Sequence, residues 1–131
     1  MDFEQRVRDS FARQTFMSTI GATLARVAEG EVEIELPFRE DLLQQSGTLH
    51  AAVLAAIADS ACGYAALTRM PEGSEVLSVE LKVNLLEPAI GERFVARARV
   101  VRSGRTLSVC AADVFGDGKL VATMLATMIR R

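Results

Sequence analysis

Histidine occurs once in this sequence of 131 residues and cysteine only twice, so few soft metal ligands are available. The two cysteines, Cys62 and Cys110, are far apart in the chain, and neither belongs to a C-x-x-C pair. So few histidine and cysteine ligands argue against a Cys/His metal site. Cys62 falls in an alanine-rich apolar run and Cys110 in a strand-like segment. We therefore expect two small buried thiols in a reducing compartment, rather than a disulfide or a catalytic cysteine.

Lysine is also scarce, with Lys82 and Lys119 as its only examples, and the formal net charge is −2. A chain without basic excess gives no reason to expect a nucleic-acid partner. The charged N-terminal segment lacks the apolar stretch of a signal peptide. The longest apolar run, from about His50 to Leu67, is interrupted by Asp59, so it predicts a helix buried in protein rather than a membrane span. We expect a cytoplasmic protein without a membrane partner.

The hydrophobic pattern predicts one domain over residues 1–131, since half of the residues are hydrophobic and no linker divides the chain. The predicted elements are a short amphipathic helix within 3–17, strands at 19–28 and 31–36, a long helix at about 49–68, and strands at 76–86, 93–102, 105–115 and 119–129. Short connections favour antiparallel neighbours. An almost wholly apolar helix beside such a sheet must be wrapped by it. The expected class is α+β, with a curved antiparallel sheet around one central helix.

Alternation within the strands predicts which side chains face the core. In the strand at 31–36, the glutamates are expected to face water and Val32, Ile34 and Leu36 to face inward. In the strand at 76–86, alternation places the aliphatic side chains from Leu77 to Leu85 on the core face and Ser78 on the opposite, polar face. Tyr64 and Cys110 are interpreted as packing residues.

Asp59 is the main candidate for chemistry, because it is the only charged residue inside the apolar helix. A carboxylate in an apolar helix loses hydration and needs partners. The alternative is a structural role, with the carboxylate satisfied by a backbone N–H or by an arginine across an interface. His50, the only histidine, falls at the helix start, where its alternative role is also that of a structural hydrogen bonder.

His50 and Asp59 are nine residues apart, which on a continuous helix gives roughly 13 Å of rise and nearly opposite faces. The two side chains are therefore not expected to share a site within one chain. Two subunits related by a two-fold axis could bring Asp59 of one to the helix start of the other, giving two equivalent sites. Free N–H groups near Ala51 at that helix start would stabilise a developing oxyanion.

The run from Gly47 through Leu49-His50-Ala51-Ala52 to Asp59 resembles the PaaI-like hotdog thioesterases, where Gly-x-x-His-Gly-Gly leads into a central helix with an acidic residue nine positions after the histidine. The resemblance covers about residues 18–131 and includes the segments 78–88 and 102–107. It implies a hotdog fold and hydrolysis of acyl-CoA thioesters without metal or other cofactor. It also implies homodimers, commonly paired into tetramers, with sites at the dimer interface.

By position, the resemblance gives Asp59 the role of general base or nucleophile and Gln44 the role of an amide that polarises the thioester. It assigns His50 to orienting the thioester, the N–H of Ala51 to the oxyanion, and Ser78 to holding the water. Two departures stand out. Alanines replace the family's two glycines after the histidine, and the polar-face position of Ser78 counts against its role.

The phosphates of CoA need cationic partners, and Arg102 and Arg105 on either side of a turn at a strand end are the candidates. Ser103 lies in the same turn and is included in the predicted CoA-binding group. The alternative is that these arginines are simply solvated. Two further functions stay open, namely a hydratase or dehydratase acting on acyl thioesters and a non-catalytic acyl-CoA binding module. The acyl group itself is open between aromatic, short-chain and medium-chain esters.

Overall fold

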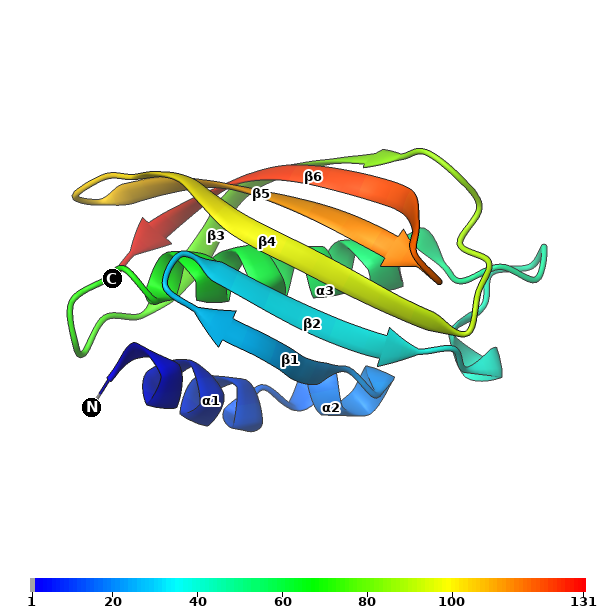
Figure 1. Ribbon diagram of the computed structural model, residues 1–131, viewed down its shortest axis with the longest axis horizontal. Helices are drawn as coiled ribbons and strands as arrows, with labels where there is room; N and C mark the ends of the chain where they lie inside the picture. Colours follow the sequence, from blue (N-terminus) through cyan, green and yellow to red (C-terminus); the bar gives the residue numbers. More distant parts are fainter. Residues whose placement is uncertain (1) are drawn as a thin grey trace.

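The fold described here is that of a computed structural model covering residues 2–131, and it contains the two strands, long helix and four strands predicted from the sequence (Figure 1). Two short helices come first, and a single 3₁₀ turn precedes the long helix. In chain order the elements are α1 (Phe3–Arg13), α2 (Thr15–Ile20), β1 (Thr23–Ala28), β2 (Glu31–Pro37), η1 (Glu40–Leu42), α3 (Ala51–Leu67), β3 (Val76–Leu85), β4 (Arg93–Ser103), β5 (Leu107–Gly116) and β6 (Lys119–Arg130).

The strands form one antiparallel sheet in the order β1-β2-β4-β5-β6-β3, which curves over α3 (Figure 1). The predicted α+β class is therefore confirmed. The hairpin between β5 and β6 turns at Asp117 and Gly118, both with positive φ, as a two-residue type I′ turn requires. In Figure 1, α1 and α2 lie beside β1 at one edge of the sheet, and β3 forms the other edge.

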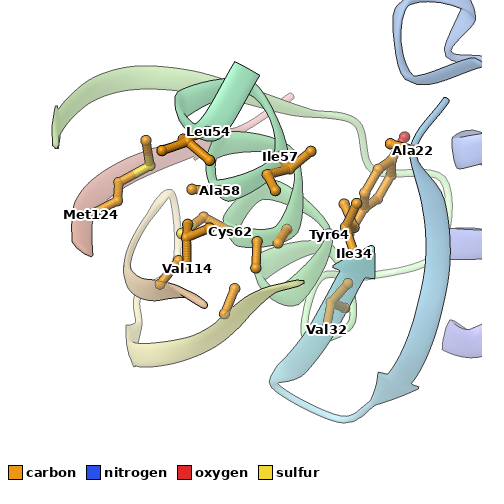
Figure 2. Packing of buried hydrophobic residues seen from close by; sticks show 14 of the residues in the cluster. Ala22, Val32, Ile34, Leu54, Ile57, Ala58, Cys62, Tyr64, Val114 and Met124 are labelled. Atoms are coloured by element: carbon orange, nitrogen blue, oxygen red, sulfur yellow. The ribbon is translucent and has the colours of Figure 1, made fainter. Parts of the chain in front are cut away.

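The core lies between α3 and the concave face of the sheet (Figure 2). Ala58, Ala61 and Ala65 are fully buried, because side chains this small let the curved sheet approach the helix closely. Cys62 packs beside Val114 in the same layer, and both cysteines are buried free thiols, as predicted. The inward-facing side chains of β2 are buried as alternation predicted, and those of β4 are buried beside them; together they are Val32, Ile34, Leu36, Phe94, Ala96 and Ala98.

The predicted boundary between the first helix and the first strand is wrong. The helix is interrupted at Gln14 and resumes as α2, which continues to Ile20, so residue 19 is helical rather than extended. Gly21 ends α2 with φ 83°, and its N–H donates to the carbonyls of Met17 and Ser18. A left-handed glycine is a common helix terminator, and it delays the strand until Thr23.

A β-bulge in β3 overturns the predicted faces at the start of this strand. Ser78 pairs with Met128 and Glu80 pairs with Thr127, so Val79 is an extra residue without a partner on β6. Directly paired residues share a face of the sheet, and Met128 is fully buried beneath it. Ser78 therefore faces α3.

The residue before the bulge changes face for the same reason. Leu77, predicted to face the core, pairs with Ile129 on the convex side and is 47% exposed. Beyond the bulge the predicted pattern holds, because Leu81 and Val83 lie opposite the buried Ala126 and Met124. An inserted residue reverses the alternation on one side of it only.

The Thr68 side chain links the end of α3 to the turn between β1 and β2 through hydrogen bonds. Its buried Oγ1 accepts a hydrogen bond from the N–H of Gly30 at 2.7 Å and donates one to the carbonyl of Ala65 at 2.7 Å. We predict that Thr68→Val lowers the free energy of unfolding by about 1–3 kcal/mol, because the buried N–H of Gly30 loses its acceptor. Urea denaturation would measure this, with the exposed Thr23→Val as a matched control. A loss no larger than that of the control would contradict the assignment.

Candidate functional site

A cavity of about 810 Å³ opens where α1, α3 and the start of β3 meet. Its α3 wall is one helical face, with residues spaced as neighbouring turns require. They are Asp59, Ser60, Gly63, Tyr64 and Leu67. The start of β3, from Val76 to Ser78, and Met128 of β6 form the opposite wall. We call this space the first cavity.

Asp59 and Ser78 are in direct contact at the edge of the first cavity. The hydroxyl of Ser78 donates to Oδ1 of Asp59 at 2.6 Å, a length typical of a hydrogen bond to a carboxylate. The bond holds the carboxylate in one orientation. Asp59 is partly exposed rather than buried, since its side of α3 faces the cavity and not the sheet. The carboxylate therefore keeps part of the hydration that it was expected to lose, and Ser78 is the partner that it was expected to need.

A hydrogen-bonded cluster adjoins Asp59 within the same cavity. The Gln14 amide donates from Nε2 to the Tyr64 hydroxyl at 3.0 Å and accepts at Oε1 from the Ser60 hydroxyl at 3.1 Å. The hydroxyls of Ser10 and Tyr64 are 3.1 Å apart. Tyr64 was interpreted from the sequence as a packing residue. It does pack against Phe11, and its hydroxyl also takes part in this cluster.

A second cavity of about 330 Å³ lies at the start of α3. It is lined by the loop residues Gln44 and Thr48, by Ala51 and Leu54 of α3, and by the segment 85–89 that follows β3. Gln44 is held by its own loop, because its Nε2 donates to Oγ1 of Thr48 at 2.6 Å and its Oε1 accepts from the N–H of Ser46. A primary amide has two N–H groups, so one remains for a ligand.

His50 is the N-cap of α3. Its Nδ1 accepts from the N–H of Ala52 at 2.9 Å, so the neutral ring carries its proton on Nε2. The ring does not line either cavity. Among residues 2–131, no hydrogen bond engages the N–H of Ala51, which leaves this donor available to an oxyanion.

The two cavities have no lining residue in common. Asp59 and Ser78 belong to the first cavity, whereas Gln44 and Ala51 belong to the second. Because α3 is one continuous helix from Ala51 to Leu67, the carboxylate and the free N–H stay separated along its axis. The structure thus brings the predicted residues together as two pairs within one chain.

Arg102, Ser103 and Arg105 are exposed around the turn between β4 and β5, and none of them lines a cavity. The strand register places this turn at the same end of the sheet as Ser78. Three strand spacings, roughly 14 Å, separate β4 from β3. A role in phosphate binding stays a prediction for these residues.

The cysteines contribute no nucleophile. Burial raises the pKa of the Cys110 thiol to about 11, and burial together with the neighbouring Cys110 also raises the pKa of Cys62. Both groups therefore stay protonated at neutral pH. No cluster of His, Cys, Asp and Glu within residues 2–131 is arranged to hold a metal ion. None of the helices described here has the length and apolarity needed to cross a membrane.

Sequence reasoning missed the part of the site contributed by α1 and by Tyr64. The signal was present in the helical spacing, because residues 60, 63, 64 and 67 share a face with Asp59. Nothing local, however, indicates that Gln14 lies against Ser60, since the two are 46 positions apart and meet only in the folded chain.

Comparison with known proteins identifies relatives of this chain. The family model described as the thioesterase superfamily matches residues 46–123. Human acyl-coenzyme A thioesterase 13 is 32% identical over 103 residues, covering 76% of this chain and 73% of the human protein.

Two solved structures extend the comparison. A thioesterase family protein from Silicibacter pomeroyi is 50% identical with a TM-score of 0.94, covering 98% of this chain and 97% of the other. The Escherichia coli PaaI protein from the phenylacetic acid degradation operon has a TM-score of 0.90 at 18% identity, covering 98% of this chain and 93% of the other. The second likeness shows a shared hotdog fold alone, and the predicted fold is confirmed.

The buried thiols lead to a simple test. We predict that a disulfide dye such as dithiobis-nitrobenzoate finds no fast-reacting thiol in the native protein at neutral pH, because both groups are buried and protonated. After denaturation the same dye should titrate two thiols per chain. A stoichiometric fast reaction of the native protein would contradict this assignment and would reopen the question of a reactive cysteine.

Proposed function

Because the chain belongs to the thioesterase superfamily, we propose that it hydrolyses acyl-CoA thioesters to a free acid and CoA, with Asp59 as the catalytic carboxylate. The observation that carries this proposal is the contact between Asp59 and Ser78. A carboxylate held by one hydrogen bond on the wall of a large cavity is placed to act on water or on a thioester carbonyl.

The reaction needs an oxyanion site as well as a carboxylate. The carbonyl oxygen of the thioester accepts a hydrogen bond from the N–H of Ala51, at the positive end of the α3 dipole. In the general-base route, Asp59 takes a proton from water as the water oxygen attacks the carbonyl carbon. The C–S bond then breaks, and the CoA sulfur leaves with that proton. In the nucleophile route, the Asp59 carboxylate attacks the carbonyl carbon, and the C–S bond breaks to release CoA as the thiolate. Water then hydrolyses the mixed anhydride, which regenerates the Asp59 carboxylate and gives the free acid, whose proton passes to the CoA sulfur.

Both routes require Asp59 and Ala51 at one carbonyl, which a single chain does not provide. We infer that a second copy supplies the missing half. Among residues 2–131, the outer edge of β3 has no partner strand, and Leu81 and Leu85 on this strand are 41% and 53% exposed. A long edge strand that exposes leucine side chains is suited to pairing with another chain.

Two-fold symmetry determines what such a pairing would bring together. When β3 pairs antiparallel with its own copy, the start of one strand lies beside the end of the other. Ser78 stands near the start of β3 with Asp59 of α3 bonded to it, and Leu85, which lines the second cavity, stands at the end of the strand. The carboxylate of one protomer is therefore carried to the second cavity of its partner, giving two equivalent sites per dimer.

The hydratase alternative would use a histidine for proton transfer. Nδ1 of His50 already accepts the helix-cap hydrogen bond from Ala52, and His50 lines neither cavity. Both facts favour hydrolysis over hydration. Gln44 and the free N–H of Ala51, grouped in the second cavity, suit a carbonyl that becomes an oxyanion.

We predict that Asp59→Asn lowers kcat for acyl-CoA hydrolysis by about 10²- to 10⁴-fold, the usual contribution of a positioned base, while the dimer persists. Ser78→Ala should lower kcat with little change in KM, and Ser78→Thr should restore it, because Ser78 acts by positioning Asp59. Dye-detected CoA release across a panel of acyl-CoAs would measure these effects.

Asp113→Asn is the matched control, because Asp113 lies on the convex face of the sheet, away from both cavities. Light scattering and thermal unfolding would verify that each variant keeps its assembly. Full activity of Asp59→Asn would remove Asp59 from the mechanism. Stoichiometric acyl-CoA binding without turnover by the unmodified protein would instead identify a binding module.

A mixed dimer tests whether two subunits share the site. Ala51→Pro removes the proposed donor, yet proline is well tolerated at the first helical position, and His50 already has the extended conformation that precedes proline. We predict that Ala51→Pro and Asp59→Asn chains are each inactive alone, whereas a heterodimer purified with two different tags regains up to half of the wild-type kcat. That heterodimer holds one intact pair, with Ala51 from one chain and Asp59 from the other.

A heterodimer without activity would contradict the shared site. If the site lay within one chain, every chain of the heterodimer would lack one of the two groups, and mixing would restore nothing. Thermal unfolding of the Ala51→Pro protein near the wild-type midpoint would show that the loss is not one of folding.

A further inference from the structure

The turn between β5 and β6 is hydrogen-bonded to the turn that precedes β4. Asp117 accepts at Oδ2 from the N–H of Glu92 at 3.0 Å and at Oδ1 from the N–H of Arg93 at 3.1 Å. Its own N–H donates to the carbonyl of Arg93 at 2.9 Å. Two successive backbone N–H groups therefore hold the two carboxylate oxygens, an arrangement that suits an anion. In Figure 1 both turns lie at the same end of the sheet.

The backbone of each turn is shaped for this contact. Asp117 has φ 47°, a left-handed conformation that aspartate tolerates better than most residues. On the other turn, Gly91 has φ 150°, and a Cβ at this position would lie 2.9 Å from Oδ2 of Asp117. Only glycine lets the carboxylate approach the backbone this closely. The contact therefore depends on a particular residue in each of the two turns.

The segment that Asp117 anchors forms one wall of the second cavity. Residues 85–89 line this cavity, directly before the anchored turn. The same hairpin also holds the beginning of the segment, because the carbonyl of Val121 accepts from the N–H groups of Leu86 at 2.9 Å and Glu87 at 3.3 Å. The β5–β6 hairpin thus fixes the wall at both ends, and Asp117 provides the side-chain bonds at the later end.

One hydrogen bond connects this wall to the start of α3. The N–H of Leu49 donates to the carbonyl of Ala89 at 3.3 Å. Leu49 comes immediately before the N-cap His50, and Ala51 follows with the N–H that was proposed as the oxyanion donor. A change in the path of the wall would therefore disturb the backbone that presents this donor.

We propose that Asp117 is a positioning residue for thioester hydrolysis, because it holds the second-cavity wall and, through Ala89, the start of α3. This inference rests on the proposed function. Asp117 lines neither cavity, so its effect reaches the substrate only through the backbone that it anchors. An oxyanion donor stabilises the transition state more than the bound ester, so the loss of Asp117 changes kcat more than KM.

The kinetic test removes the acceptors without straining the turn. Asp117→Gly deletes both carboxylate oxygens, and glycine adopts positive φ freely, so the hairpin keeps its backbone. We predict that kcat for acyl-CoA hydrolysis falls about tenfold while KM stays within about twofold, as measured by dye-detected CoA release. Asp117→Asn keeps one acceptor oxygen and gives the Asn-Gly pair that this turn favours, so its kcat should lie between the two.

Amide hydrogen exchange followed by NMR tests the mechanical connection without any substrate. In Asp117→Gly, the N–H of Leu49 should exchange about tenfold faster than in the wild type, because its acceptor lies on the released segment. The N–H of Gly30, which is bonded to Thr68 at the other end of α3, should keep its wild-type rate. Equal acceleration at both amides would indicate a global loss of stability and would overturn the proposed connection.

Two glycine variants separate the carboxylate from the stability of the turn. Gly118→Ala strains the same hairpin at φ 84°, but its Cβ meets nothing within 4 Å and Asp117 is retained. It should lower the thermal midpoint and leave kcat unchanged. Gly91→Ala should instead reproduce the kcat loss of Asp117→Gly, because the added Cβ displaces the carboxylate from the other side.

Each failure has a separate meaning. Unchanged exchange at Leu49 in Asp117→Gly, or faster exchange with unchanged kcat, would overturn the positioning role and leave the proposed function standing. A kcat loss in Gly118→Ala equal to that in Asp117→Gly would assign the effect to the turn rather than to the carboxylate. Absence of hydrolysis by the wild-type protein for every ester would overturn the proposed function and the positioning role with it, whatever the exchange rates.

Discussion

The geometry around Asp59 depends on one extra residue in an edge strand. Val79 has no partner on β6, and its insertion turns Ser78 from the convex face of the sheet to the face that meets α3. Only there can the Ser78 hydroxyl reach Oδ1 of Asp59 at 2.6 Å. A bulge costs one ladder interaction, but at a sheet edge that loss is small, and the gain is a carboxylate of defined orientation.

The second constraint is the stiffness of α3. A continuous helix packed with alanines under a curved sheet cannot bend to bring its first turn to Asp59, so each chain holds half of the proposed site at each end of β3. The same edge strand that carries the bulge also carries the exposed leucines. Association through this strand would therefore complete the site and cover the apolar edge in a single step.

The sequence pattern predicted those features that depend on residues near one another in the chain. The apolar run gave α3, alternation gave the inward face of β2, and the surroundings of the cysteines gave buried thiols. The bulge at Val79 lay beyond this reasoning, because Leu-Ser-Val-Glu-Leu alternates perfectly and the extra residue shows only in the register with β6. The α1 wall was missed for a similar reason, since Gln14 and Ser60 come together through tertiary packing alone.

The proposed hydrolytic residues and the α1 side of the first cavity fall on different parts of the chain. Asp59 and Ser78 lie within residues 46–123, the segment shared with the thioesterase superfamily, whereas Gln14 precedes it. A family match to this segment therefore bears on thioester hydrolysis but carries no information about the wall that α1 builds. Because α1 contacts the first cavity through side chains on its surface, substitutions there can change the lining without disturbing the hydrogen bond that orients Asp59. Substrate choice could thus diverge among relatives while the hydrolytic residues stay fixed, and the acyl group has to be inferred from the whole folded chain.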